Sequence, residues 1–185
     1  SYAALLLAGL RGRERDGSTV IESMIRGAGG GGQGIGVQWA EWVSAILFNG
    51  LGRYDRALAA AERAAEELPQ LFISRWACPE LIEAAVRSGR ADRSAAALEP
   101  WAQVTATAGT DWALGIVARS RALLSEGETA EGLYREAVER LSRTQMRPEL
   151  ARAHLLYGEW LRRQNRRVDA RAQLRTAHEQ LTSIG

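Results

Sequence analysis

The sequence predicts an all-α fold, a right-handed solenoid of four to five antiparallel helix pairs. Ala, Leu, Arg and Glu dominate the 185 residues, whereas Val, Ile and Thr supply only 24, and this composition favours helices over strands. A helix-turn signal also recurs through the chain, at Gly12-Arg13, Gly52-Arg53, Gly89-Arg90, Gly127-Glu128 and Asn165-Arg166. The intervals of 40, 37, 38 and 38 residues indicate a repeated structural unit.

Each signal separates two segments of helical period. Glycine and asparagine tolerate the left-handed backbone with which many helices end. We therefore expect first helices over 2–11, 37–50, 76–88, 111–126 and 148–164, and second helices over 14–27, 54–68, 91–107, 128–143 and 167–183. Pro69 is expected to close the second of these second helices, and Pro79 and Pro148 are expected in the first turns of two first helices.

Small residues recur at one spacing on the second helices and predict close contact between the helices of a pair. They are Ala57, Ala61 and Ala64, then Ala130 and Ala137 around Tyr134, then Ala170 and Ala177 around Leu174. The predicted core contains Leu47, Ala57, Ala61, Leu81, Ala85, Leu98, Leu123, Leu133, Ala137, Leu156, Ala170 and Leu174.

Two parts of the chain are expected to differ in regularity. Residues 1–34 would form a weaker helix pair followed by a glycine-rich linker, and residues 35–185 would form the repeats. The glycine-rich stretch 27–36 matches G-x-G-x-x-G and could be a phosphate cradle, but helical sequence precedes it where a dinucleotide site needs a strand. We expect a flexible linker. Because the chain begins with Ser1, we expect it to be part of a longer protein.

The sequence offers little for catalysis. One cysteine and two distant histidines argue against a metal site, and a chain without lysine holds no Walker motif. We expect Cys78 to be a buried, inert thiol and His154 to be packed or capped, although a pH-sensitive contact is the alternative for His154. We therefore expect no enzyme and no cofactor.

Charge and hydropathy bear on partners and location. The net charge of +2 argues against direct nucleic-acid binding, and no apolar run reaches the length of a membrane span. A soluble, cytoplasmic protein that does not bind membranes is expected. The stretch 162–175 contains only one acid, Asp169, but six arginines, at 162, 163, 166, 167, 171 and 175. They are either a patch for phosphate or an acidic partner, or a solvated helix end whose stems cover apolar surface.

Residues 50–69 resemble the tetratricopeptide repeat at Gly52, Tyr54, Ala57, Ala61, Ala64 and Pro69. The spacing near 38 exceeds the usual value of about 34, so a modified repeat is expected. Residues 147–185 look like the last helix pair of the repeat region in large ATP-binding transcriptional regulators of the LuxR family, which are often bacterial. Residues 39–64 and 109–141 are similar to earlier units of that region. The resemblance covers residues 35–185, and it implies an NTPase and a DNA-binding domain elsewhere in the parent chain.

The first helices are expected to line a concave face on which equivalent positions form rows. Alignment by the turn residues places Ile46, Glu83, Arg121 and Glu159 in one row, with Arg87 and Arg163 one turn later. Two interpretations remain open. Glu83, Arg121 and Glu159 could be a salt-bridge ladder above core tryptophans. Alternatively, a groove could bind an effector or partner through Trp39, Trp42, Trp76, Glu83, Arg87, Arg121, Glu159 and Arg163.

Three classes of function are compatible with these observations. The resemblance favours a sensor and protein-interaction module of a transcriptional regulator, which would bind a protein or a small-molecule effector. An autonomous repeat scaffold that binds a peptide or protein is the alternative, and a small enzyme is the least favoured. At the C-terminal end, Leu174, Leu181 and Ile184 are expected to expose an apolar edge that another helix, domain or protomer covers, so a homodimer is one expected partner arrangement.

Overall fold

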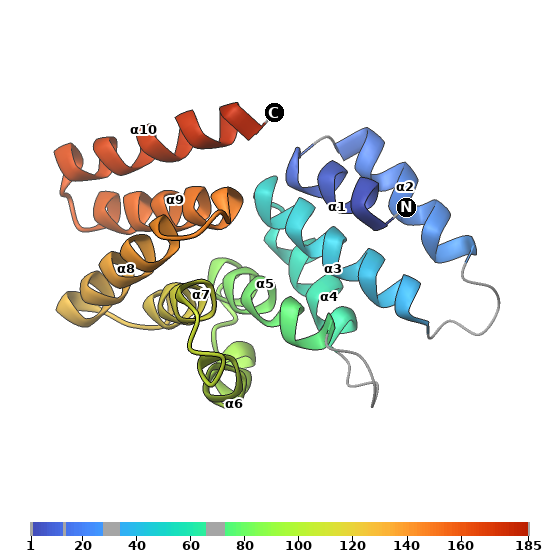
Figure 1. Cartoon of the computed structure of the whole chain (residues 1–185), viewed down its shortest axis with the longest axis horizontal. Coiled ribbons are helices and arrows are strands. Elements are labelled where there is room, and N and C mark those ends of the chain that lie inside the picture. The colour runs from blue at the N-terminus through green and yellow to red at the C-terminus, as the bar shows by residue number, and fades with distance from the viewer. Residues whose placement is uncertain (1, 13, 28–33, 66–72, 185) are drawn as a thin grey trace. The chain divides into compact units, whose positions relative to one another are not determined.

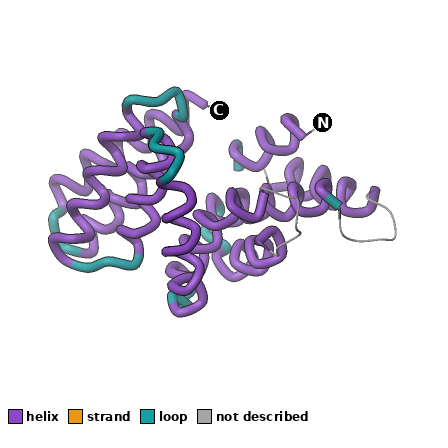
Figure 2. Tube along the Cα trace, turned by 60° about the horizontal axis from the view of Figure 1, so that its bottom comes forward, coloured by secondary structure: helices purple, strands orange, loops and turns teal. Residues whose placement is uncertain are grey.

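The computed structural model of the chain describes residues 2–12, 14–27, 34–65 and 73–184, and all regular structure within these ranges is α-helical (Figures 1 and 2). The predicted all-α class is therefore confirmed. The expected glycine-rich linker and the expected helix end at Pro69 lie outside the described residues. The helices are α1 (Tyr2–Leu10), α2 (Glu14–Gly27), α3 (Ile35–Gly50), α4 (Tyr54–Ala65), α5 (Ile73–Arg87), α6 (Asp92–Ala106), α7 (Asp111–Leu123), α8 (Gly127–Ser142), α9 (Arg147–Arg163) and α10 (Arg167–Ile184).

The turns that the sequence predicts have the expected left-handed backbone. Their φ angles are positive at Gly12 (64°), Gly52 (69°), Gly89 (76°), Gly127 (57°) and Asn165 (61°). Three of these turns close with the same backbone hydrogen bond, which runs from the amide that follows the left-handed residue to the carbonyl five positions earlier. The distances are 2.8 Å at Arg53, 2.7 Å at Arg90 and 3.0 Å at Arg166. This bond satisfies a carbonyl that the helix end leaves open.

The prediction that Pro79 lies in a first turn is wrong. Pro79 is the seventh residue of α5, which begins at Ile73. Proline removes one intrahelical hydrogen bond, but Ile73 and Ala77 are completely buried on the preceding turns. Their burial favours continuation of the helix across the missing bond. Pro148, by contrast, lies in the first turn of α9 as predicted.

The contacts divide the chain into unit 1 (Ser1–Trp101) and unit 2 (Ala102–Gly185), with the boundary inside α6. In unit 1, α3 and α4 form a hairpin, α5 packs against both, and α1 and α2 pack on α3. Its core includes Leu5, Val43, Leu47 and Leu58. A Cβ added at Gly9 would lie 2.6 Å from Val43 Cγ1, so α1 approaches α3 closely because glycine has no side chain.

In unit 2, α7 pairs with α8 and α9 pairs with α10, while α8 also packs on α9 (Figure 1). The small residues predicted to mediate close contact are buried, namely Ala57, Ala61, Ala64, Ala130, Ala137, Ala170 and Ala177. Of the predicted core, Leu123, Leu133 and Leu174 are partly exposed and the other residues are buried. At the end of α10, Leu181 is 39% exposed, whereas Leu174 and Ile184 are partly buried.

A recurring ion pair joins the turn of one hairpin to the second helix of the hairpin before it. The arginine after the left-handed residue of a turn binds an acid on the preceding second helix, and we call Arg53, Arg90 and Arg166 the turn arginines. Arg53 binds Glu14 of α2, Arg90 binds Asp55 of α4, and Arg166 binds Glu131 of α8. The acids precede their arginines by 39, 35 and 35 residues. The repeat is therefore visible in side-chain pairing as well as in the backbone.

Among the described residues, every helix is too short or too polar to cross a bilayer.

Candidate functional site

Four aromatic rings form a continuous cluster in unit 1, and three of them are predicted site residues. Trp39 lies 5.0 Å from Trp42 and 5.9 Å from Trp76 between ring centroids, and Trp42 lies 5.4 Å from Trp76. Tyr2 of α1 adds a fourth ring, 5.3 Å from Trp39. We call Tyr2, Trp39, Trp42 and Trp76 the aromatic cluster.

The aromatic cluster is packed at its base and open at its edge. Trp39 and Trp42 pack against the core of unit 1, whereas Trp76 is 37% exposed and Tyr2 is 43% exposed. Trp39 contacts Tyr2, Trp42 and Trp76 edge to face, and such contacts fix the positions of the rings. The cluster therefore presents a preformed apolar surface.

The charged residues predicted beside these tryptophans are not an open row. Glu83 is only 3% exposed, and its carboxylate lies 3.6 Å from Nε of Arg87 one turn later on α5. The Arg87 guanidinium lies over the Tyr54 ring, 5.2 Å from its centroid. Glu83 is thus inside unit 1, where it cannot contact a surface ligand without rearrangement.

The remaining predicted residues belong to unit 2. Arg121 lies in the last turn of α7 and is partly buried, as is Glu159 of α9. Arg163 is exposed at the end of α9. The predicted row that joins Glu83 to Arg121 and Glu159 includes residues of both units.

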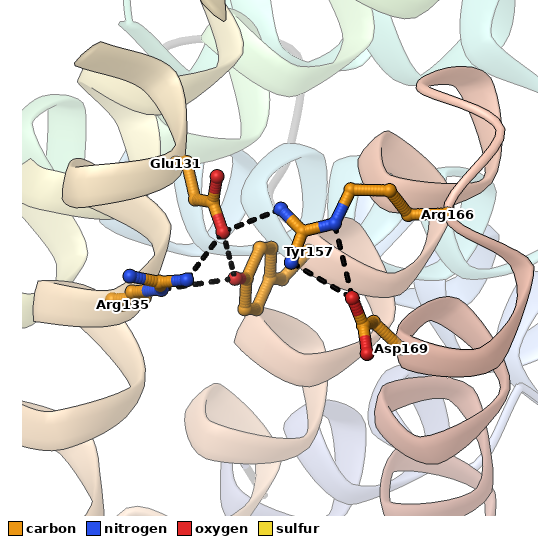
Figure 3. Close-up of polar contacts among 5 residues, drawn as sticks. All are labelled: Glu131, Arg135, Tyr157, Arg166 and Asp169. Atoms are coloured by element: carbon orange, nitrogen blue, oxygen red, sulfur yellow. Dashed lines mark hydrogen bonds and ion pairs between the residues drawn. The ribbon is translucent and has the colours of Figure 1, made fainter. Parts of the chain in front are cut away.

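A polar cluster in unit 2 was not predicted from the sequence. It joins α8, α9 and the start of α10 and consists of Glu131, Arg135, Tyr157, Arg166 and Asp169 (Figure 3). One carboxylate oxygen, Oε1 of Glu131, is its centre. This oxygen accepts hydrogen bonds from Arg135 Nη2 at 2.6 Å, Arg166 Nη1 at 2.6 Å and the Tyr157 hydroxyl at 3.2 Å.

The outer bonds of the cluster extend from this centre in two directions. Nε of Arg135 donates to the Tyr157 hydroxyl at 3.3 Å. On the other side, Nε and Nη2 of Arg166 both donate to Oδ2 of Asp169, at 3.0 Å and 2.8 Å. The hydrogen bond from Arg166 is the main reason that the pKa of Glu131 is lowered. The bonds from Arg166 therefore favour the ionised form of the Glu131 carboxylate.

A cavity of about 420 Å³ adjoins this cluster between α8 and α10. Its apolar lining comes from Val138, Leu161 and Ala172, and its polar lining comes from Arg135, Glu139, Tyr157, Arg166, Asp169 and Gln173. The Tyr157 ring stacks on the Tyr134 ring, with the two centroids 5.5 Å apart and an angle of 14° between the planes. The volume lies within the range of small-molecule sites, and the cavity is widely open to solvent.

The sequence contained a weak signal for this cluster. Glu131 and Arg135 are four residues apart on one helix, and Arg166 and Asp169 are three apart. The 35 residues between Glu131 and Arg166 approach one repeat length, which places them on neighbouring hairpins. Only Arg166 and Asp169 were singled out, as part of the arginine-rich stretch, and Arg166 proves to be bonded to two acids.

Two further predicted residues have ordinary surroundings. Burial raises the pKa of Cys78 to about 11, and its thiol donates to the Ser74 carbonyl at 3.4 Å. Nδ1 of His154 lies 2.6 Å from Oε1 of Gln173. Within the described part of the chain, no three His, Cys, Asp or Glu side chains gather as they would around a metal ion.

Comparison with known proteins adds no relative, since the chain matches no family model, no curated protein and no solved structure.

Proposed function

We propose that this chain is a non-catalytic sensor and interaction module of a LuxR-type transcriptional regulator. In this proposal its helix pairs stack as a right-handed, tetratricopeptide-like solenoid, and the parent chain supplies the NTPase and DNA-binding domains. The resemblance of residues 35–185 to the repeat region of such regulators supports the family. The recurring turns and turn arginines support the repeat architecture.

The observation that carries the binding function is the aromatic cluster. Exposed aromatic rings that are rigidly held are frequent anchors of protein–protein contacts, because they bury a large area at a small entropic cost. Trp76 has its ring exposed while Trp39 and Trp42 fix it from two sides. We propose that an apolar segment of a protein partner packs on Trp76 and Tyr2.

The first experiment concerns the gene. The coding sequence on both sides of this segment should encode a Walker motif upstream and a helix-turn-helix downstream. If neither is present, the regulator assignment is wrong, and the autonomous scaffold that binds a peptide or protein replaces it.

The second experiment tests the surface in the intact regulator with a transcriptional reporter. We expect Trp76→Ala to abolish or strongly reduce the response, while the protein keeps its helical content. Val168→Ala is the matched control, because Val168 is 78% exposed and lies on α10 in unit 2. An unchanged response in the Trp76 variant, or an equal loss in the Val168 variant, would contradict the proposed surface.

A further inference from the structure

The cavity between α8 and α10 has walls of balanced charge. Arg135 and Arg166 contribute two positive charges, and Glu139 and Asp169 contribute two negative charges. The ion-pair partners outside the lining leave the net charge at zero, because Arg143 pairs with Glu139 and Glu131 pairs with Arg166. Because the wall as a whole is neutral, it offers no net attraction to an anion or a cation, whereas a ligand that carries both signs can pair with both kinds of group.

Two ionised groups on the wall, one positive and one negative, each have an atom that makes no hydrogen bond within the described residues. Arg135 donates through Nε and Nη2, so within the described residues its Nη1 has no acceptor. Asp169 accepts both of its bonds at Oδ2, and in the same part of the chain Oδ1 has no donor. The Arg135 side chain is 65% exposed and the Asp169 side chain 51%, so a ligand can reach both.

These two groups stand at opposite ends of the cluster. The ion pairs run in the order Arg135, Glu131, Arg166, Asp169, and Figure 3 shows Arg135 at one end and Asp169 at the other. A ligand that contacts both must therefore carry its anionic and cationic groups on either side of a spacer. The apolar lining residues that are not buried are Val138 and Ala172.

We propose that this cavity binds a short peptide with free ends, of the size of an apolar dipeptide, with its carboxylate on Arg135 and its ammonium group on Asp169. Because Glu131 and Arg166 stand between the two groups in the series of ion pairs, we expect a dipeptide rather than a free amino acid, whose two charges share one carbon. The apolar side chains would lie on Val138 and Ala172. The proposal concerns other residues than the aromatic cluster and does not rest on the function proposed above.

Isothermal titration calorimetry with four probes tests this proposal on the unmodified chain. The probes are leucyl-leucine, its N-acetyl form, its C-terminal amide and free leucine. We expect leucyl-leucine to bind and each of the other three to bind more weakly by about tenfold or more, because a charged hydrogen bond is lost in each case. Absence of leucyl-leucine binding up to millimolar concentrations would overturn the proposal, as would equal affinity for a blocked form or for free leucine.

Variants then assign each end of the ligand. Arg135→Gln should weaken leucyl-leucine and remove the preference over the amide, while Asp169→Asn should remove the preference over the acetylated form. Arg171→Gln and Glu179→Gln are the matched controls, because both residues are exposed on α10 outside the cavity lining. If the controls weaken binding as much as the cavity variants do, the attraction is unspecific and the proposed site is wrong. Circular dichroism verifies that all four variants keep their helical content.

Discussion

Gly158 of α9 packs tightly against Leu174 of α10, and its replacement by alanine tests that packing. An added Cβ would lie 2.8 Å from Cγ of Leu174, 2.9 Å from Cδ2 and 3.1 Å from the Leu174 backbone nitrogen. The side-chain atoms can rotate away in part, but the nitrogen moves only if α10 shifts. Alanine also gains up to about 1 kcal/mol of helix propensity over glycine. Because overpacking costs about 1–3 kcal/mol, we expect Gly158→Ala to lower the free energy of unfolding by about 0.5–2 kcal/mol.

Gly132 provides the matched control, because it is exposed within α8 and an added Cβ there meets nothing within 4 Å. Gly132→Ala should therefore stabilise the protein by about 0.5–1 kcal/mol. Urea unfolding followed by circular dichroism measures both variants. In a Leu174→Ala background, the cost of Gly158→Ala should shrink, since two of its three close contacts are gone. If Gly158→Ala stabilises the protein as much as Gly132→Ala does, α9 and α10 are not packed as described.

Three further predictions concern single polar side chains. Asn49→Ala should lower the free energy of unfolding by about 1–3 kcal/mol. The Asn49 amide is buried and donates to the Glu80 carbonyl at 3.0 Å and to the Glu80 carboxylate at 2.8 Å. An unchanged urea midpoint would contradict this prediction. Because the pKa of Glu131 is lowered from 4.5 in the folded chain, chiefly by Arg166, its stabilising effect is present above pH 4.5 and disappears as the pH falls through the folded value. The stability difference between the parent chain and Glu131→Gln should therefore shrink on acidification. Cys78, with a pKa of about 11 against 9.0 when unfolded, should react with an alkylating agent at pH 8 about a hundredfold more slowly in the native protein than in urea, and equal rates would refute its burial.

The ends of the helices were the part of the structure that the sequence predicted best. Gly52 and Asn165 mark helix ends because the left-handed conformation costs them little, and this local effect does not depend on distant residues. The position of Pro79 could not be predicted in the same way. Whether a helix continues through a proline depends on how much apolar surface its earlier turns bury, and the burial of Ile73 is a tertiary property.

The polar cluster could not be predicted from the sequence for a related reason. Its members are ordinary surface residue types, and Arg135 differs in no local respect from the other arginines of the chain. Only the packing of α8, α9 and α10 directs Arg135, Arg166 and the Tyr157 hydroxyl to one carboxylate. The tryptophans were easier to predict as neighbours, because Trp39 and Trp76 are 37 residues apart, close to the repeat interval.

The turn arginines have a consequence for how a chain of this kind can lengthen during evolution. The α3–α4 hairpin carries Arg53 at its turn and Asp55 near the start of its second helix. It therefore supplies a donor to Glu14 of the hairpin before it and an acceptor to Arg90 of the hairpin after it. Duplication of a gene segment that encodes one such hairpin would thus create both halves of a new ion pair at once. Deletion of a whole segment would rejoin a compatible donor and acceptor. The pair forms at separations of both 35 and 39 residues, so it tolerates small differences in length, and whole hairpins are segments that this architecture can gain or lose with the pairing kept.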